Sequence, residues 1–116
     1  MKRANFGAIA EHIAAGLLRL KGYRIMARQL RPLRGSGAGE IDIIARRGHT
    51  LAFVEVKARA DYAQALEALS PHQQGRLQRA ALAYIAQHPG FSTFNLRFDL
   101  IAIAPWQRPR HIQNAW

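Results

Sequence analysis

Three ionisable side chains interrupt two neighbouring apolar segments of the chain. Asp42 lies in GEIDIIA, and Glu55 and Lys57 lie in FVEVKAR, with Glu55 thirteen residues after Asp42. Successive side chains of a strand point to opposite faces, so Glu55 and Lys57 share a face, and a hairpin of the two segments would bring Asp42 to them. Carboxylate oxygens bind Mg²⁺, which activates water and neutralises charge on a phosphate. The three residues predict a metal-dependent hydrolytic site, with Lys57 as a positive charge near the attacking water or the leaving oxygen.

An ion-pair network that closes one end of a sheet is the alternative interpretation of these charges, since buried pairs occur without catalysis and are weak stabilisers. We favour the site, because three groups of this kind in two adjacent apolar strands are typical of functional positions. Glu40 shares a face with Asp42 but precedes the strand. Its role stays open between a solvated strand end and a partner of Asp42.

The elements that position these residues follow from the hydrophobic pattern. Residues 4–20 predict an amphipathic helix, and its expected buried stripe consists of Phe6, Ile9, Ala10, Ile13, Leu17 and Leu20. Alternation predicts a half-exposed strand over residues 23–30, and a Gly- and Pro-containing loop over 31–39 precedes the hairpin of two buried strands.

The second half of the chain begins with a weak pattern, because residues 59–70 fit either a short helix or a flexible connection. Ser70 followed by Pro71 predicts a helix start, and Pro89 with Gly90 ends that helix. Residues 96–104 predict the last strand. The order helix, three strands, helix, strand predicts an α/β fold, a mixed β-sheet flanked by helices whose final strand follows a helical crossover.

The length of 116 residues suits one core rather than two. We expect a single domain over 1–116, with a core at about residues 4–104 and a tail over 105–116 that is either frayed or docked. No apolar run approaches the ~20 residues that span a bilayer. The chain has no cysteine, which excludes disulfides and thiolate metal sites and fits a cytoplasmic location.

The net charge of +10, from 17 basic and 7 acidic residues, predicts a polyanionic partner, and nucleic acid is favoured over a membrane surface. A solvated basic surface is the weaker interpretation. Arg34, Arg59 and Arg76 are candidate phosphate contacts. Gln73 lies one helical turn before Leu77 and therefore points toward the sheet, as either a substrate contact or a satisfied core amide.

The segments also resemble a known family. Asp42, the triplet Glu55-Val56-Lys57 and a helical Glu11 upstream resemble the D…ExK signature of the PD-(D/E)XK, or restriction-endonuclease-like, nuclease superfamily. GEIDIIA, FVEVKAR and RFDLIAI resemble the hallmark segments of the YraN-like family of small bacterial proteins, which is similar to archaeal Holliday-junction resolvases. The resemblance covers about residues 4–104 and implies a restriction-endonuclease-like core.

The resemblance implies that Asp42 and Glu55 bind Mg²⁺ or Mn²⁺, that Lys57 assists the water, and that Glu11 completes the acidic cluster. Periodicity alone places Glu11 about 140° from Phe6 at ~100° per residue, which favours a solvated helix face. Relatives usually have a lysine near the position of Gln73, so the departure PHQQGR leaves a phosphate contact there open.

Three classes of function follow. The first is a metal-dependent endonuclease that hydrolyses DNA, including branched or structured DNA, as a homodimer that pairs two sites. The second is a nucleic-acid-binding module that retains the fold without catalysis, and the third is a partner-binding protein anchored by its Trp-containing tail. Arg97 and Asp99 are expected to form a structural pair. The five histidines lack metal-ligand spacing and are expected at the surface.

Overall fold

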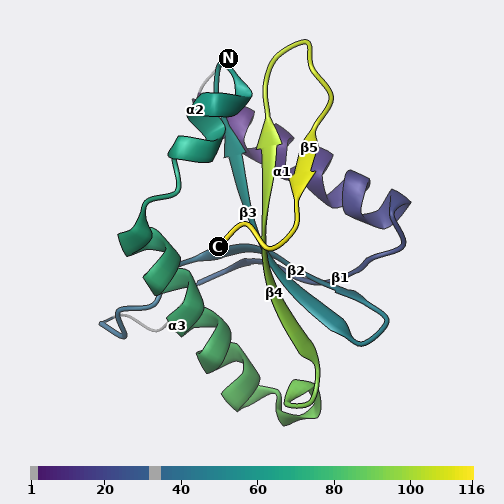
Figure 1. The fold of residues 1–116 in the computed structure, drawn as a ribbon, viewed down its shortest axis with the longest axis vertical. Coiled ribbons are helices and arrows are strands. Elements are labelled where there is room, and N and C mark those ends of the chain that lie inside the picture. Colours follow the sequence, from purple (N-terminus) through teal and green to yellow (C-terminus); the bar gives the residue numbers. More distant parts are fainter. Residues whose placement is uncertain (1–2, 32–34) are drawn as a thin grey trace.

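A five-stranded mixed sheet forms the centre of the molecule, with the strands in the order β1-β2-β3-β4-β5 (Figure 1). This computed structural model describes the backbone of residues 3–31 and 35–116 and the side chains of residues 7–31 and 35–116. The strands are β1 Arg24–Leu30, β2 Ile41–Arg47, β3 Thr50–Ala58, β4 Asn95–Ile103 and β5 Arg110–Ile112. Neighbouring strands are antiparallel except β3 and β4, which are parallel. The predicted α/β architecture with a mixed sheet is confirmed.

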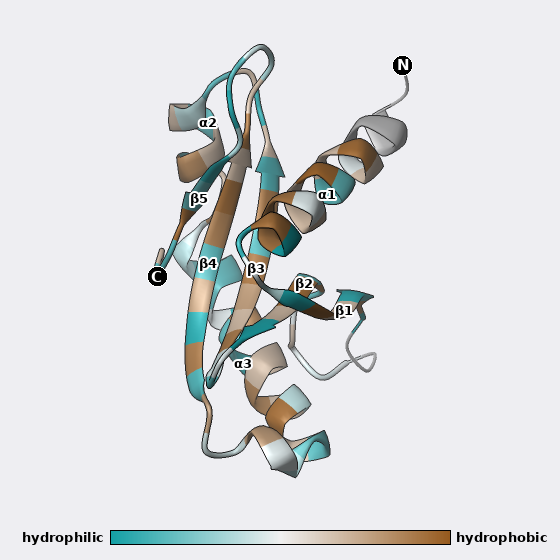
Figure 2. Ribbon diagram, turned by 90° about the vertical axis from the view of Figure 1, so that its right-hand side faces the viewer, coloured by the Kyte–Doolittle hydropathy of each residue, from teal (hydrophilic) through white to brown (hydrophobic). Residues whose placement is uncertain are grey.

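Helices cover both faces of this sheet. They are α1 Arg3–Leu20, α2 Tyr62–Glu67 and α3 Pro71–Gln87, with a short 3₁₀ turn η1 at Pro89–Phe91. One core lies between α1 and the sheet, and a second, richer in aromatic side chains, lies between α3 and the opposite face (Figure 2). Because parallel strands need a long crossover, α2 and α3 together connect β3 to β4. The predicted order lacked α2 and β5, so the observed order is α-β-β-β-α-α-β-β.

Side-chain caps define where α2 and α3 begin. Asp61 accepts a hydrogen bond from the backbone nitrogen of Gln64 at 2.9 Å, which starts a helix in the segment that the sequence left open. Ser70 accepts one from the backbone nitrogen of Gln73 at 3.2 Å, as the Ser-Pro pair predicted.

The buried face of α1 differs from the predicted stripe. Ile9, Ile13 and Leu20 are 41%, 40% and 89% exposed, so the prediction that they face the core is wrong. The helix instead buries a face of small residues together with one leucine and one acid: Ala10, Glu11, Ala14, Ala15 and Leu18. Alanines let the helix approach the sheet closely. This close packing, and not the burial of the larger apolar side chains, determines which face of the helix meets the sheet. Glu11 is therefore on the buried face.

The C-terminal tail is docked, and a buried ion pair holds it. His111 in β5 donates through Nε2 to Oδ2 of Asp99 at 2.8 Å, and Asp99 also binds the guanidinium of Arg97 at 2.8 Å. The side chain of His111 is 3% exposed, so the expectation that the histidines lie at the surface is wrong for this residue. The two tryptophans differ, since Trp116 packs on Phe98 with ring centroids 5.5 Å apart, whereas Trp106 is fully exposed.

Among the residues that the structure describes, no helix combines the length and the apolar character needed to cross a bilayer.

Candidate metal and nucleic-acid site

Asp42 and Glu55 lie opposite one another where β2 begins beside β3. The antiparallel register pairs Ile43 with Val54, the residues that follow Asp42 and precede Glu55 in the chain. Oδ2 of Asp42 accepts a hydrogen bond from the backbone nitrogen of Val56 at 2.8 Å. Glu55 is 5% exposed. The structure thus brings together the two carboxylates that the sequence singled out.

The acidity of Glu55 reflects this position. Burial raises its pKa to about 9, the hydrogen bond and the negative charge of Asp42 act in the same direction, and the charge of Lys57 and the Val56 backbone oppose them. A carboxyl with this pKa keeps its proton at neutral pH, because two adjacent carboxylates in a buried site do not both ionise readily. The pair therefore holds a proton that a cation would displace.

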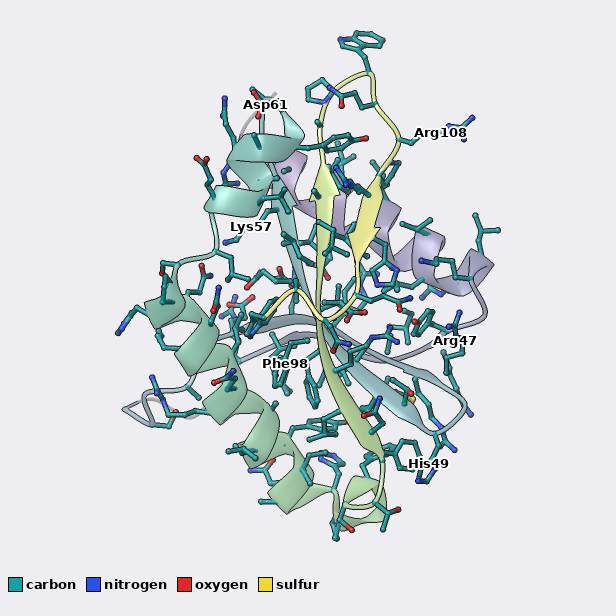
Figure 3. The ribbon with its side chains drawn as sticks, viewed as in Figure 1. Arg47, His49, Lys57, Asp61, Phe98 and Arg108 are labelled. Atoms are coloured by element: carbon teal, nitrogen blue, oxygen red, sulfur yellow. The ribbon has the colours of Figure 1, made fainter. Side chains whose placement is uncertain are left out.

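Lys57 and Gln73 approach Glu55 from two elements. Lys57 follows Glu55 by two residues on β3 and so shares its face; it is half-buried, and its position is labelled in Figure 3. Gln73, in the first turn of α3, donates from Nε2 to Oε2 of Glu55 across a long 3.5 Å contact. Gln73 points toward the sheet, as predicted, and contacts the glutamate.

An open cavity of about 380 Å³ lies between α1 and the sheet beside this pair. Its polar lining comes from Glu11, Gln29, Glu40, Asp42 and Arg59. Asp42 therefore faces a space that solvent and a ligand can enter, while Glu55 lies on the more enclosed side of the pair. Glu40 lines the same cavity as Asp42, but it is exposed and its side chain lies 4.0 Å from Arg31, so both interpretations of this residue stay open.

Both carboxylate oxygens of Glu11 accept hydrogen bonds from β1. Arg28 donates to Oε1 from Nε at 3.0 Å, and Gln29 donates to Oε2 from Nε2 at 2.8 Å. The register of β1 shifts between Ile25 and Ala27, and such a bulge changes which face the following side chains occupy. Arg28 thereby turns toward α1, and Glu11 is held on the wall of the cavity by a salt bridge.

Arg28 and Gln29 are the site residues that the sequence interpretation missed. Simple alternation placed Arg28 on the exposed side of a half-exposed strand, and a bulge leaves no mark in this run of residues. Gln29 has a φ of 51°, a left-handed conformation that glycine and asparagine adopt far more readily. A glutamine at this position therefore gives no signal of that conformation in the sequence.

The donor set is compatible with a hard divalent cation that keeps part of its water shell. Asp42 and Glu55 supply carboxylate oxygens, whereas both oxygens of Glu11 are engaged by Arg28 and Gln29, so Glu11 lines the cavity without joining the pair as a third ligand. Over residues 3–31 and 35–116, no three acidic or histidine side chains gather closely enough to form a complete protein cage. Mg²⁺ suits such a site, because it is commonly bound through one or two carboxylates and several waters.

The candidate phosphate contacts lie in different places. Arg59 is exposed and lines the cavity, and its backbone nitrogen donates to Ile103 at 3.0 Å. Arg76 instead braces the loop before β2: its backbone oxygen accepts from Gly39 at 3.0 Å and its Nη2 donates to Ala38 at 3.4 Å. Arg34 lies outside the described residues. Of the two candidate arginines in the described residues, Arg59 lies at the cavity and Arg76 does not line it.

Known proteins share this sequence over nearly its whole length. A protein of Paramagnetospirillum magneticum is 54% identical over 110 residues, covering 95% of this chain and 85% of the relative. Proteins of Parvibaculum lavamentivorans and Mesorhizobium japonicum are 51% and 42% identical over the same length, with 80% and 85% of the relatives covered. Each bears the name UPF0102 protein, and the profile of that family matches residues 10–103. The chain therefore belongs to the uncharacterised protein family UPF0102.

Proposed function

We propose that this protein is a metal-dependent nuclease that hydrolyses DNA phosphodiester bonds, built on a restriction-endonuclease-like core of the PD-(D/E)XK type. One observation carries the proposal: the half-buried Asp42 and the buried Glu55 lie together beside an open cavity, with the charge of Lys57 acting on Glu55. Structural ion pairs match a base to an acid. Here two acids lie together, an arrangement that is costly without a cation and useful with one.

Each residue has a distinct part in this hydrolysis. Asp42 and Glu55 would hold the ion, with the Val56 carbonyl as a further oxygen donor, and Gln73 orients Glu55 through its amide. Lys57 supplies positive charge close to the attacked phosphate and orients the water. The ion, when bound, supplies a water of lowered pKa and neutralises charge on the phosphate. Attack of water on phosphorus breaks one P–O ester bond and leaves a phosphate monoester and a hydroxyl.

Glu11 and Arg59 shape the approach of the substrate. Arg28 and Gln29 hold the carboxylate of Glu11 in a fixed position on the wall of the cavity. There it favours a cation, and not a phosphate, on its side of the cavity. Arg59 lies at the same cavity as an exposed cation, where its planar fork can bind a backbone phosphate in a bidentate manner. The net charge of +10 supports DNA as the polyanion.

Cleavage of end-labelled DNA by the pure protein tests the proposal. Duplex, forked and four-way-junction DNA are incubated with Mg²⁺, with Mn²⁺ or with EDTA. Wild type should cleave at least one substrate only with metal, and Asp42→Asn and Lys57→Ala should each lose most of that activity. Glu67→Gln is the matched control, because Glu67 is an exposed carboxylate on α2 outside the cavity lining. Cleavage that survives in both site variants contradicts the mechanism.

The same experiment separates the nuclease from the nucleic-acid-binding module. A module that only binds would show affinity that falls steeply with salt, no dependence on metal and no cleavage of any of the three substrates.

A further inference from the structure

The loop between β4 and β5 presents an indole ring to solvent. It connects Ile103 to Arg110 at the end of the sheet where β3 and β4 finish, and it projects beyond the strands in Figure 1. Trp106, near its start, is fully exposed. Its φ of 63° is a left-handed conformation that is an outlier for a bulky residue. Strain of this kind persists where surrounding contacts impose it, and it gathers at binding sites.

Contacts with α2 hold the loop in this shape. The hydroxyl of Tyr62 donates a hydrogen bond to the backbone oxygen of Arg108, and the guanidinium of Arg110 lies 5.8 Å from the centre of the Tyr62 ring. At the other side of the turn, the backbone nitrogen of Gln107 donates to Ala104 at 3.4 Å. The indole is therefore presented by a braced turn, whereas the second tryptophan, Trp116, packs on the sheet.

This loop belongs to the same end of the molecule as the cavity. Ile103, the last residue of β4, accepts the backbone hydrogen bond of Arg59, which lines the cavity with Asp42. Trp106 follows Ile103 by three residues, a span of at most ~11 Å. Figure 3 shows Lys57 and Arg108 in the same half of the molecule. A nucleic acid whose phosphate lay at the cavity would pass close to the indole.

We propose that Trp106 is a base-stacking platform that binds an unpaired nucleobase of DNA beside the phosphate held in the cavity. The proposal rests on the nuclease function proposed above, because it takes DNA as the ligand of that site. It identifies the substrate class as DNA with a single-stranded segment next to a duplex, such as a fork, flap or branch, since the base pairs inside a duplex are covered on both faces by their neighbours.

The chemistry around the ring favours this ligand. An aromatic face stacks on any base, and positive charge near it holds the connecting phosphates. Arg108 and Arg110 flank the turn, and Arg59 lies at the cavity. Much of the cost of binding comes from the ordering of side chains and loops. The loop that carries this ring is already braced, so the ring loses little conformational freedom when it stacks.

Binding without cleavage tests the proposal, so the measurements are made in EDTA. The probes are a short blunt duplex and the same duplex extended by a single-stranded tail, each with a fluorescent label. Trp106→Ala should weaken binding of the tailed duplex by about 5- to 150-fold, as expected for one stacked base, and should change binding of the blunt duplex less than twofold. Trp106→Phe should retain part of the affinity. Leu82→Ala is the control, because Leu82 is also an exposed apolar residue but lies on α3 and not in the loop.

Intrinsic fluorescence gives a second readout on the ring itself. The chain has two tryptophans, so Trp116→Phe leaves Trp106 as the sole tryptophan, and excitation at a wavelength that the three tyrosines do not absorb selects its emission. The tailed duplex should quench this emission and the blunt duplex should not. The affinity comparison keeps Trp116, so it does not depend on whether the Trp116→Phe variant folds. Trp106 lies outside both cores, so its own substitution should leave the fold intact.

Several outcomes would overturn the proposal. One is equal affinity of wild type and Trp106→Ala for the tailed duplex, and another is an equal loss on both probes. Emission that is unchanged by the tailed duplex but shifts to the blue with anionic phospholipid vesicles would assign the ring to a membrane. Metal-dependent cleavage with no role for Trp106 refutes only the platform. Quenching by the tailed duplex in a protein that cleaves nothing supports the platform and refutes the nuclease.

Discussion

Oδ2 of Asp42 lies 2.8 Å from the backbone nitrogen of Val56, the residue between Glu55 and Lys57. The start of β2 is thereby fixed to β3 through a side chain as well as through the strand register. It also holds the Asp42 carboxylate where it raises the pKa of Glu55 in addition to the effect of burial. The pairing of acids is thus part of the fold, and its consequences are measurable without any substrate.

The Glu55→Gln variant should remove a pH dependence from the stability of the metal-free protein. The pKa of Glu55 is raised from 4.5 to about 9 in the folded chain, so between these values the folded state holds a proton that the unfolded chain releases. Each upward step in pH then favours unfolding, with a slope of up to ~1.4 kcal/mol per pH unit. Urea unfolding of wild type and variant in EDTA from pH 5 to 9 should show the variant gaining relative stability as pH rises. A difference that does not change with pH would contradict the raised pKa.

Binding of a divalent cation should release the proton of Glu55. At pH 7.5 the folded protein holds this proton, and a carboxylate must lose it to bind a cation, so Mg²⁺ or Mn²⁺ should displace about one proton per ion. Calorimetric titration in two buffers with different ionisation enthalpies measures that number. Asp42→Asn should abolish the binding, and Glu67→Gln should leave it unchanged. Binding with no proton release would mean that Glu55 is not a ligand.

Asp99→Asn should destabilise the fold strongly. Asp99 is completely buried, and Arg97, His111 and the backbone nitrogen of Asn114 all donate to it. Burial alone would raise its pKa, but the hydrogen bonds from His111 and Arg97 outweigh this and lower the pKa below the ordinary value. An uncharged amide would leave the guanidinium without its counter-charge, at a cost of about 3–5 kcal/mol.

Urea unfolding at neutral pH measures this loss, with the exposed Glu67→Gln as the control. The lowered pKa of Asp99 also predicts that its contribution persists down to about pH 4 and is lost as pH falls further, through the folded pKa. A loss smaller than about 1 kcal/mol at neutral pH would show that the cluster is not a main support of β4 and β5.

Local patterns were sufficient to predict the strands that hold the candidate site. Asp42 and Glu55 interrupt apolar runs whose pairing follows from a short turn, and Ser70 with Pro71 marks the start of α3, so adjacent residues carry this information. β5 is different. Its three residues show no period, and it is held by the contact of His111 with Asp99, twelve residues earlier in the chain. Such a strand depends on a tertiary contact that the tail sequence does not display.

The residues that line the cavity wall could not be predicted from the alternation of apolar and polar residues in the sequence. A bulge in β1 turns Arg28 toward α1, and a left-handed Gln29 completes the contacts of Glu11. Periodicity alone favoured a solvated face for Glu11, because large apolar side chains dominate a helical stripe, and the resemblance alone assigned it to the site; close packing on the sheet selects the alanine face, which includes Glu11.

Two leucines of α1 test this orientation directly. Leu18 is fully buried and Leu20 is 89% exposed, although the predicted stripe placed Leu20 in the core and left Leu18 out of it. Leu18→Ala should lower the free energy of unfolding by about 2–5 kcal/mol, as for other buried leucines, and Leu20→Ala should change it by about 0.5 kcal/mol or less. The two substitutions are chemically identical, so the difference between their urea midpoints reports burial alone. Leu18 lies seven residues after Glu11 and therefore on the same side of the helix. A larger loss from Leu20→Ala would mean that α1 packs through the opposite face, which would take Glu11 away from the cavity that Asp42 and Glu40 line.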